Sequence, residues 1–189
     1  GTCRKLTAAQ RSAKMQQRRP AWRIKVDDEL IAFTDMHYGR QQANLAHECG
    51  DFILRRSDGV YAYQLAVVID DALMGVNQVV RGCDLLSSTP VQLYLYRLLK
   101  LTPPSFCHIP LLTDAAGRRL SKRDGDLEIA ALRQHFGSPE PIIGLLAYLA
   151  GQLPKPEPIT AAELLPLFRP ESVPQDNIVA PQLLELRRQ

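Results

Sequence analysis

The sequence predicts an α/β domain followed by a small helical region, and two observations support this prediction. Strand and helix patterns alternate between residues 51 and 110, as expected of a parallel α/β sheet. Past Asp126 the pattern becomes helical, with proline-containing joints at 154–158 and near 170–174. We therefore expect a domain boundary near residue 125.

The N-terminal residues have a pattern of their own. Thr7 and Gln10 form a capping box, which predicts a basic helix that ends before Pro20. Beyond this helix we expect a strand at 22–26, a turn at 27–28 and a second strand at 30–33. A loop or a single helical turn should follow at 40–49.

In the α/β region we expect three strands, at 51–56, 77–81 and 106–109. Two helices are expected between them, at 62–74 and 87–99. Gly75 marks the end of the first helix, and Ser87 to Pro90 is a hydroxyl cap followed by proline that starts the second. Val91, Leu95 and Leu98–Leu99 are expected on its buried side. Three further helices are expected at 127–136, 139–152 and 160–168, before a tail with a last short helix.

The composition fits an ordinary globular chain. Hydrophobic residues make up 46% and charged residues 23% of the 189 positions, and no window approaches eighteen uninterrupted apolar residues, so we expect no membrane span. Four scattered cysteines without a Cys-x-x-Cys pair favour reduced thiols in a cytoplasmic protein. Residues 1–23 carry seven basic side chains and no acid, which favours a polyanion such as RNA, although solvated basic helices are also common.

The most informative candidate site is the segment from Leu111 to Gly125. Asp114 to Gly117 predicts a turn, and four of the next six residues are cationic. Lysine and arginine on a glycine-flanked loop suit phosphate binding and can stabilise charge on a pyrophosphate leaving group. A solvated basic turn is the alternative interpretation.

A second candidate site combines Tyr63 and Arg81. Arg81 is expected at the C-terminal end of a strand, where open α/β sheets bind ligands, and its guanidinium suits a carboxylate. Tyr63 can add a phenolic hydrogen bond, but a core tyrosine and a strand-end ion pair explain the residues equally well. Asp70–Asp71 admits a metal or acid–base role, yet it also simply ends a helix.

The segment 119–123, Arg-Leu-Ser-Lys-Arg, resembles the second signature of class I aminoacyl-tRNA synthetases, Lys-Met-Ser-Lys-Ser, in the form usual among glutamyl enzymes. Ser121 and Lys122 match this signature, whereas Arg119 and Arg123 depart from it. The resemblance implies that Lys122 is the catalytic lysine that contacts ATP, with Ser121 and Leu120 in the same signature loop. His108 opens a His-Ile-Pro-Leu-Leu stretch that is similar to the family's adenosine-side strand, although on its own it fits a structural histidine.

Two further stretches, Tyr61-Ala-Tyr-Gln and Arg81-Gly-Cys-Asp-Leu, are more similar to glutamyl-queuosine tRNA(Asp) synthetases than to discriminating glutamyl-tRNA synthetases. Residues 50–59 and 1–4 fit the same family. The resemblance implies that Tyr63 and Arg81 bind glutamate and that Leu85 lines the pocket. It also implies that Cys3 is the last ligand of a Zn²⁺ site whose other ligands lie upstream; without the resemblance, Cys3 is more simply an incidental small residue.

The resemblance implies an incomplete Rossmann-like class I aminoacyl-tRNA synthetase catalytic domain over 1–125, with a zinc-knuckle remnant and acceptor-type subdomain at 1–50. A helical stem-contact region follows at 126–189. The first signature, His-Ile-Gly-His, is absent, and Met36-His-Tyr-Gly39 does not replace it because it follows a strand and is not expected to open a helix. We therefore expect an N-terminally truncated chain.

The implied activity is the activation of glutamate by ATP and Mg²⁺ to glutamyl-adenylate, followed by transfer to the queuosine of tRNA(Asp). The expected enzyme is a cytoplasmic monomer. One alternative is a truncated discriminating glutamyl-tRNA synthetase. The other is a catalytically inactive fragment that binds tRNA or another partner, because half of the adenylate site lies outside the sequence.

Overall fold

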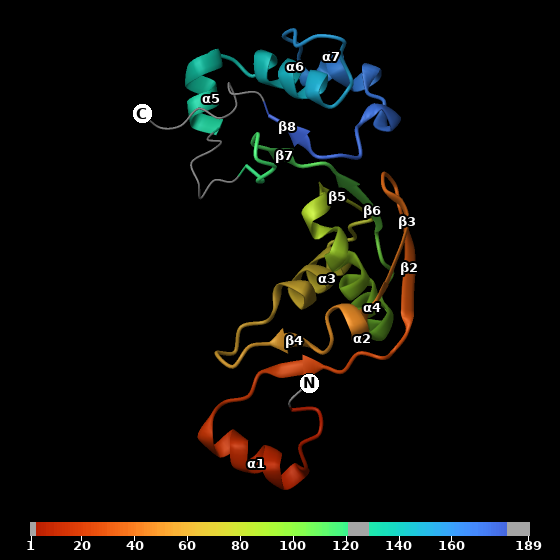
Figure 1. The fold of residues 1–189 in the computed structure, drawn as a ribbon, viewed down its shortest axis with the longest axis vertical. Helices are drawn as coiled ribbons and strands as arrows, with labels where there is room; N and C mark the ends of the chain where they lie inside the picture. The colour runs from red at the N-terminus through yellow and green to blue at the C-terminus, as the bar shows by residue number, and fades with distance from the viewer. Residues whose placement is uncertain (1–2, 121–128, 181–189) are drawn as a thin grey trace. The chain divides into compact units, whose positions relative to one another are not determined.

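The computed structural model describes residues 3–120 and 129–180, which belong to two compact units (Figure 1). The first unit contains residues 1–80 and 85–107, and the second contains residues 81–84 and 108–189. The two units are described separately below. The expected boundary near residue 125 falls among residues 121–128, outside the described ones, and stays a prediction.

The first unit begins with helix α1 (Ala8–Gln17), whose capping box is confirmed. The Thr7 hydroxyl accepts a hydrogen bond from the Gln10 amide at 3.3 Å, and the Gln10 side chain accepts one from the Thr7 amide at 2.9 Å. No residue of α1 is buried, so its cap stabilises it more than packing does. The helix ends before Pro20, as expected.

Two antiparallel strand pairs follow. Strand β1 (Trp22–Ile24) pairs with β4 (Phe52–Arg55), and β2 (Leu30–Asp35) forms a hairpin with β3 (Gly39–Asn44). The expectation of a loop at 40–49 was therefore wrong for its first half, although helix α2 (Leu45–Glu48) is the short helical turn that was expected. The strand at 51–56 is not part of a parallel sheet either, because its ladder partner is β1.

The sequence around Met36 forms the turn of the β2–β3 hairpin and opens no helix, as expected. Buried Asp35 explains this turn, because its carboxylate accepts hydrogen bonds from the amides of His37 and Tyr38 at 3.0 and 2.9 Å.

Two helices pack together in the core of the first unit, α3 (Tyr63–Leu73) and α4 (Thr89–Leu99). Both agree with the expected bounds within about two residues. Val91 and Leu95 are buried as predicted, but Leu98 and Leu99 are 46% and 42% exposed, so that part of the prediction was wrong. Tyr94 and Tyr96 are buried instead, because the buried stripe of α4 continues through the middle of the helix.

The start of α4 also differs from the prediction. The Ser88 side chain makes no capping hydrogen bond, because the 3₁₀ helix η1 (Cys83–Ser88) leads directly into α4. Strand β5 (Gln78–Gly82) precedes η1 and pairs with β6 (Ser105–Ile109). The division between the two units falls within both strands.

The second unit contains a short parallel pair, β7 (Leu112–Thr113) and β8 (Ile178–Val179), with helical segments between them. These segments are α5 (Ile129–Phe136), α6 (Glu140–Leu149), α7 (Ala161–Leu164), η3 (Leu165–Leu167) and η4 (Pro170–Ser172). The three predicted helices are thus present, although the third is shorter and continues as 3₁₀ helix. The core of the second unit is formed by Leu132, Leu145 and Ala180, and Leu112 and Leu120 pack against these residues. A last short helix was expected in the tail from Pro174; residues 174–180 form a loop and β8, and residues 181–189 lie outside the described ones.

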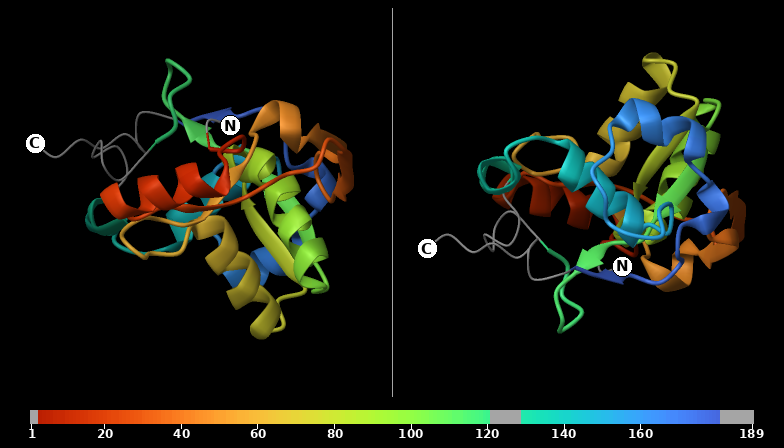
Figure 2. Two further views of the ribbon diagram at one scale, coloured as in Figure 1. Left: turned by 90° about the horizontal axis from the view of Figure 1, so that it is seen from below. Right: turned by 90° about the horizontal axis from the view of Figure 1, so that it is seen from above.

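Figure 2 shows the same ribbon from below and from above. Within the part of the chain that the structure describes, no helix combines the length and the apolar character that crossing a membrane requires.

Candidate active site

The hairpin after β7 positions the start of the predicted signature loop. Thr113 bridges to Arg119, and the amide of Leu120 donates to the carbonyl of Leu112 at 3.1 Å. Between them the chain turns at Gly117, whose φ of +78° favours glycine. Leu120 packs against the core of the second unit. The hairpin therefore fixes both ends of the turn and the residue directly before Ser121.

Asp114 holds this turn together. Its carboxylate accepts hydrogen bonds from the amides of Ala116 and Arg118, at 3.0 and 2.8 Å, and from Arg118 Nε at 3.1 Å. The backbone bond from Arg118, followed by its side-chain bond, keeps the pKa of Asp114 below its ordinary value of 3.8. The pattern of aspartate, two small residues and glycine predicted a turn, and the structure adds that the aspartate itself closes it.

Arg119 forms an ion pair with Asp84 of η1. An added Cβ at Gly82 would lie 2.6 Å from Asp84 Oδ1 and 2.8 Å from a methyl carbon of Leu111, so a side chain there would displace the ends of these two side chains. Asp84 was not among the site residues predicted from the sequence. Its position three residues after Arg81 was the available signal.

Arg81 and His108 come together in the second unit. Arg81 Nε donates to His108 Nε2 at 3.0 Å, and His108 is completely buried. Acceptance at Nε2 places the ring proton on Nδ1. The contact fixes the plane of the Arg81 guanidinium, so His108 orients the residue predicted to bind the glutamate carboxylate.

Asn177 is a second residue of this region that was not predicted from the sequence. Its side-chain oxygen accepts hydrogen bonds from the Leu111 amide at 2.9 Å and from the Cys83 thiol at 3.4 Å. The tail that contains Asn177 thus connects η1 with the strand leading into the signature hairpin. Nothing in its own sequence indicated this, because the contacts span 66 and 94 positions.

Tyr63 and Leu85 belong to the first unit, and Arg81 and His108 to the second. Tyr63 is the first residue of α3 and is 58% exposed, whereas Leu85 in η1 is partly buried. Gln64 beside Tyr63 accepts a hydrogen bond from buried Gln92 at 2.8 Å, which ties this end of α3 to α4. The predicted roles of Tyr63 and Leu85 in glutamate binding stay predictions.

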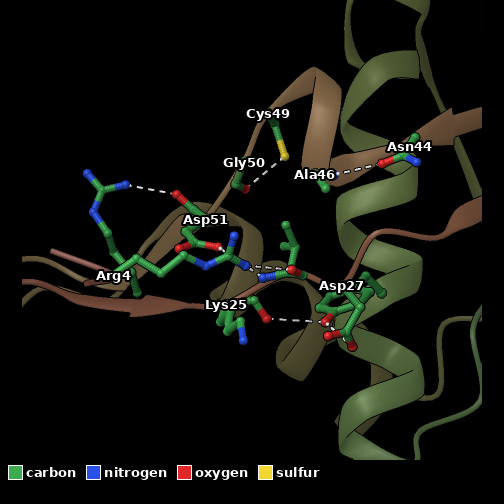
Figure 3. A network of polar contacts seen from close by, with 11 residues as sticks. Arg4, Lys25, Asp27, Asn44, Ala46, Cys49, Gly50 and Asp51 are labelled. Carbon is green, nitrogen blue, oxygen red and sulfur yellow. Dashed lines mark hydrogen bonds and ion pairs between the residues drawn. The ribbon is translucent and has the colours of Figure 1, made fainter. Parts of the chain in front are cut away.

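Cys3 is an exposed free thiol next to a well-anchored residue. Arg4 donates to the Val26 carbonyl at 2.9 Å and pairs with Asp51 at 3.3 Å, as Figure 3 shows. Asp51 also accepts the Val26 amide at 3.1 Å, so the segment after Cys3 is held near the β1–β4 pair. No group of three or more histidine, cysteine or acidic side chains among the described residues could hold a metal ion. The described residues alone do not fit a Zn²⁺ or Mg²⁺ site.

Ser121, Lys122 and Arg123 lie outside the described residues. Their predicted roles in the signature loop and in ATP binding stay predictions, which the hairpin supports only up to Leu120.

Comparison with known proteins places this arrangement in a family. Residues 1–165 match the family described as tRNA synthetases class I (E and Q), catalytic domain. The chain belongs to this family. It is 50% identical to the glutamyl-Q tRNA(Asp) synthetase of Nitratidesulfovibrio vulgaris and 47% identical to that of Symbiobacterium thermophilum, each over 96% of this chain. The chain spans 56% of the length of both relatives.

Solved structures of class I synthetases share the fold. A glutamate tRNA ligase from Elizabethkingia meningosepticum, crystallised in complex with its amino acid, matches 92% of this chain and 39% of its own with a TM-score of 0.71. The glutamate-tRNA synthetase of Elizabethkingia anophelis matches 93% of this chain and 40% of its own with a TM-score of 0.72. Both are 24% identical to it. The predicted class I synthetase fold is therefore confirmed.

Proposed function

We propose that this chain forms part of a ligase that activates glutamate with ATP and transfers it to the queuosine of tRNA(Asp). The observation that carries the proposal is its 47–50% identity to two proteins named glutamyl-Q tRNA(Asp) synthetase over 96% of the chain. The ligase acts in the cytoplasm, as a monomer.

The chemistry of the side chains supports the first step. Arg81, oriented by His108, can bind the substrate carboxylate, and the Tyr63 hydroxyl adds a hydrogen bond to glutamate in a pocket lined by Leu85. Lys122, with Ser121 beside it, neutralises charge on the departing pyrophosphate after the Asp114 turn. Together these groups hold and orient the reactants. None of them acts as a general acid or a general base.

The metal predictions belong to the same proposal. Cys3 supplies one thiolate to a Zn²⁺ site, and its other ligands come from outside these 189 residues. Mg²⁺ enters with ATP. No step of the proposed reaction is assigned to Zn²⁺.

The test compares radioactive glutamate transfer to tRNA(Asp) with and without queuosine and to tRNA(Glu), using the longest natural form of the protein. We expect transfer only to queuosine-containing tRNA(Asp). Lys122→Ala should abolish glutamate-dependent ATP–pyrophosphate exchange, whereas Arg133→Ala should not. Transfer to tRNA(Glu) would indicate a discriminating glutamyl-tRNA synthetase, and tRNA binding without any transfer would indicate an inactive binding module.

A further inference from the structure

Two exposed aromatic side chains and a partly buried guanidinium group lie at one end of the β1–β4 pair. Trp22 is the ladder partner of Arg55, and Arg55 in turn bridges to Tyr61. Trp22 is 67% exposed and Tyr61 is 59% exposed. The β1–β4 ladder has a β-bulge between Trp22 and Arg23, but Trp22 still lies opposite Arg55 and Arg55 opposite Tyr61. Directly opposite residues of antiparallel pairs are side-chain neighbours, so Trp22, Arg55 and Tyr61 follow one another across this end of the pair.

The Arg55–Tyr61 pair has the closer of the two antiparallel geometries. Hydrogen bonds of 2.8 Å flank it on both sides, from the Arg56 amide to Val60 and from the Ala62 amide to Leu54. The Arg55 guanidinium carbon lies 5.3 Å from the centre of the Tyr61 ring, within the range of a cation–π contact. One ring face therefore contacts the guanidinium, while more than half of the side chain stays open to solvent.

A second arginine reaches the same place from the end of α1. A Cβ placed on Gly59 would lie 3.5 Å from one guanidinium nitrogen of Arg55 and 3.6 Å from one of Arg19. Arg55 Nε also donates to the Gly59 carbonyl at 3.0 Å, which holds its guanidinium over the loop.

The charge of this surface is not balanced nearby. Within the described ranges, neither Arg19 nor Arg55 forms an ion pair with a carboxylate, and the Asp58 carboxylate in the same loop pairs with Arg56 at 2.7 Å. Two guanidiniums held close together repel each other unless an anion lies between or beside them. The surface is therefore suited to an anionic ligand that also presents flat rings.

We propose that Trp22, Tyr61, Arg55 and Arg19 form a binding surface for unpaired RNA nucleotides. Bases stack on the two aromatic rings, and the guanidiniums contact the phosphates between those bases, which is how single strands bind without sequence readout. A duplex offers the same phosphates but no open base faces, so the exposed rings favour an unpaired strand. The inference rests on the proposed action on tRNA, and it adds the surface that holds an unpaired segment of that substrate.

Trp22 is the single tryptophan of the sequence, so its fluorescence reports on this surface directly. The 189-residue chain is titrated with a single-stranded RNA heptamer and with an RNA hairpin stem that carries the same number of phosphates. We expect the heptamer to quench the fluorescence and to bind more tightly than the stem.

Matched variants separate stacking from charge. Tyr61→Ala should weaken heptamer binding roughly 5- to 100-fold, while Tyr61→Phe should retain it, because stacking needs only the ring. Arg55→Gln and Arg19→Gln should each weaken binding, whereas Arg133→Gln, the same change at an exposed position of α5, should not. Circular dichroism of every variant checks that it is folded.

The proposal would be overturned if the heptamer did not quench the fluorescence, or if the stem bound as tightly as the heptamer. Quenching by polyglutamate as strong as that by the heptamer would also overturn it and would indicate an acidic protein partner. Glutamate transfer to tRNA(Asp) that survives Tyr61→Ala with an unchanged KM for tRNA refutes this surface and leaves the proposed function intact. Quenching by RNA without any glutamate transfer refutes the proposed function instead.

Discussion

Asp84 and Arg119 lie 35 positions apart in the sequence, and their ion pair links η1 to the signature hairpin. Their side chains are 32% and 56% exposed, so the pair is expected to contribute no more than about 1 kcal/mol to the free energy of unfolding. Its main effect is therefore local: it holds Arg119 against η1. The sequence could not show this pair, because a carboxylate and a guanidinium so far apart carry no spacing signal.

Asp84→Asn should loosen the hairpin without unfolding the unit. Asparagine keeps the size of the side chain above Gly82 and removes its charge. We expect trypsin to cleave after Arg119 several-fold faster, measured by mass spectrometry, with a change in unfolding free energy below about 1 kcal/mol. Asp58→Asn, which breaks a similarly exposed pair with Arg56, is the control and should leave the rate after Arg119 unchanged. An unchanged rate in Asp84→Asn would contradict the positioning role.

Asp114 should make the turn of the hairpin sensitive to acid. Its folded-state pKa lies below the ordinary value of 3.8, chiefly because of the hydrogen bond from the Arg118 amide. A lowered carboxyl pKa stabilises the fold above the unfolded-state value, and this stabilisation is lost as pH falls through the folded-state pKa. The amide NMR signals of Ala116 and Arg118 should therefore titrate together, with a midpoint below pH 3.8. Asp114→Asn should abolish this titration, and a midpoint above the ordinary value would refute the arrangement.

Helix ends could be predicted at the scale of single elements, because their signals are local. The Thr7 capping box, Gly75 and Pro90 each act within one helical turn, and α1, α3 and α4 begin and end close to them. Strand partners could not be predicted in the same way. β4 pairs with β1, and β8 returns to β7 across 65 residues, and neither pairing follows from the pattern of the strand itself.

Helix α6 shows how one element depends on another through a glycine. Gly144 lies in the interior of α6, where alanine normally stabilises a helix by about 1 kcal/mol. Here an added Cβ would lie 1.9 Å from the carbonyl oxygen of Glu157, which is backbone and cannot simply rotate away. Gly144→Ala should therefore destabilise the second unit by about 1–3 kcal/mol in chemical denaturation.

Gly137, between α5 and α6, provides the control for this substitution. It has a φ of +74° and no atom within 4 Å of an added Cβ, so only backbone conformation opposes a side chain there. Gly137→Ala should cost about 1 kcal/mol, and Gly137→Asn less, because asparagine tolerates the left-handed region. Stabilisation by Gly144→Ala would show that the Glu157 backbone does not restrict α6.

At the scale of the whole molecule, the family could be predicted from short motifs, whereas the arrangement of the site could not. The signature at 119–123 and the Arg81 stretch identified the class I synthetases, and the match over residues 1–165 confirms this. The orienting role of His108 and the Asp114 turn needed coordinates, since both depend on hydrogen-bond geometry. The functional interpretation of Lys122 still depends on resemblance alone, because its neighbourhood lies outside the described residues.

Charge distribution yields the last prediction. The net charge is only +3, but residues 1–23 hold seven of the 23 basic side chains and no acid. If unpaired RNA binds beside this segment, its affinity should fall with salt, and each lost phosphate contact should reduce the slope of log affinity against log salt by about 0.7. Arg19→Gln and Arg55→Gln should each cause this reduction in fluorescence titrations.

The double reversal Arg11→Glu and Arg18→Glu should weaken RNA binding further, since both side chains are exposed on or beside α1. An unchanged RNA affinity in the double reversal would restrict the contact to the Trp22–Tyr61 row and exclude α1 from it.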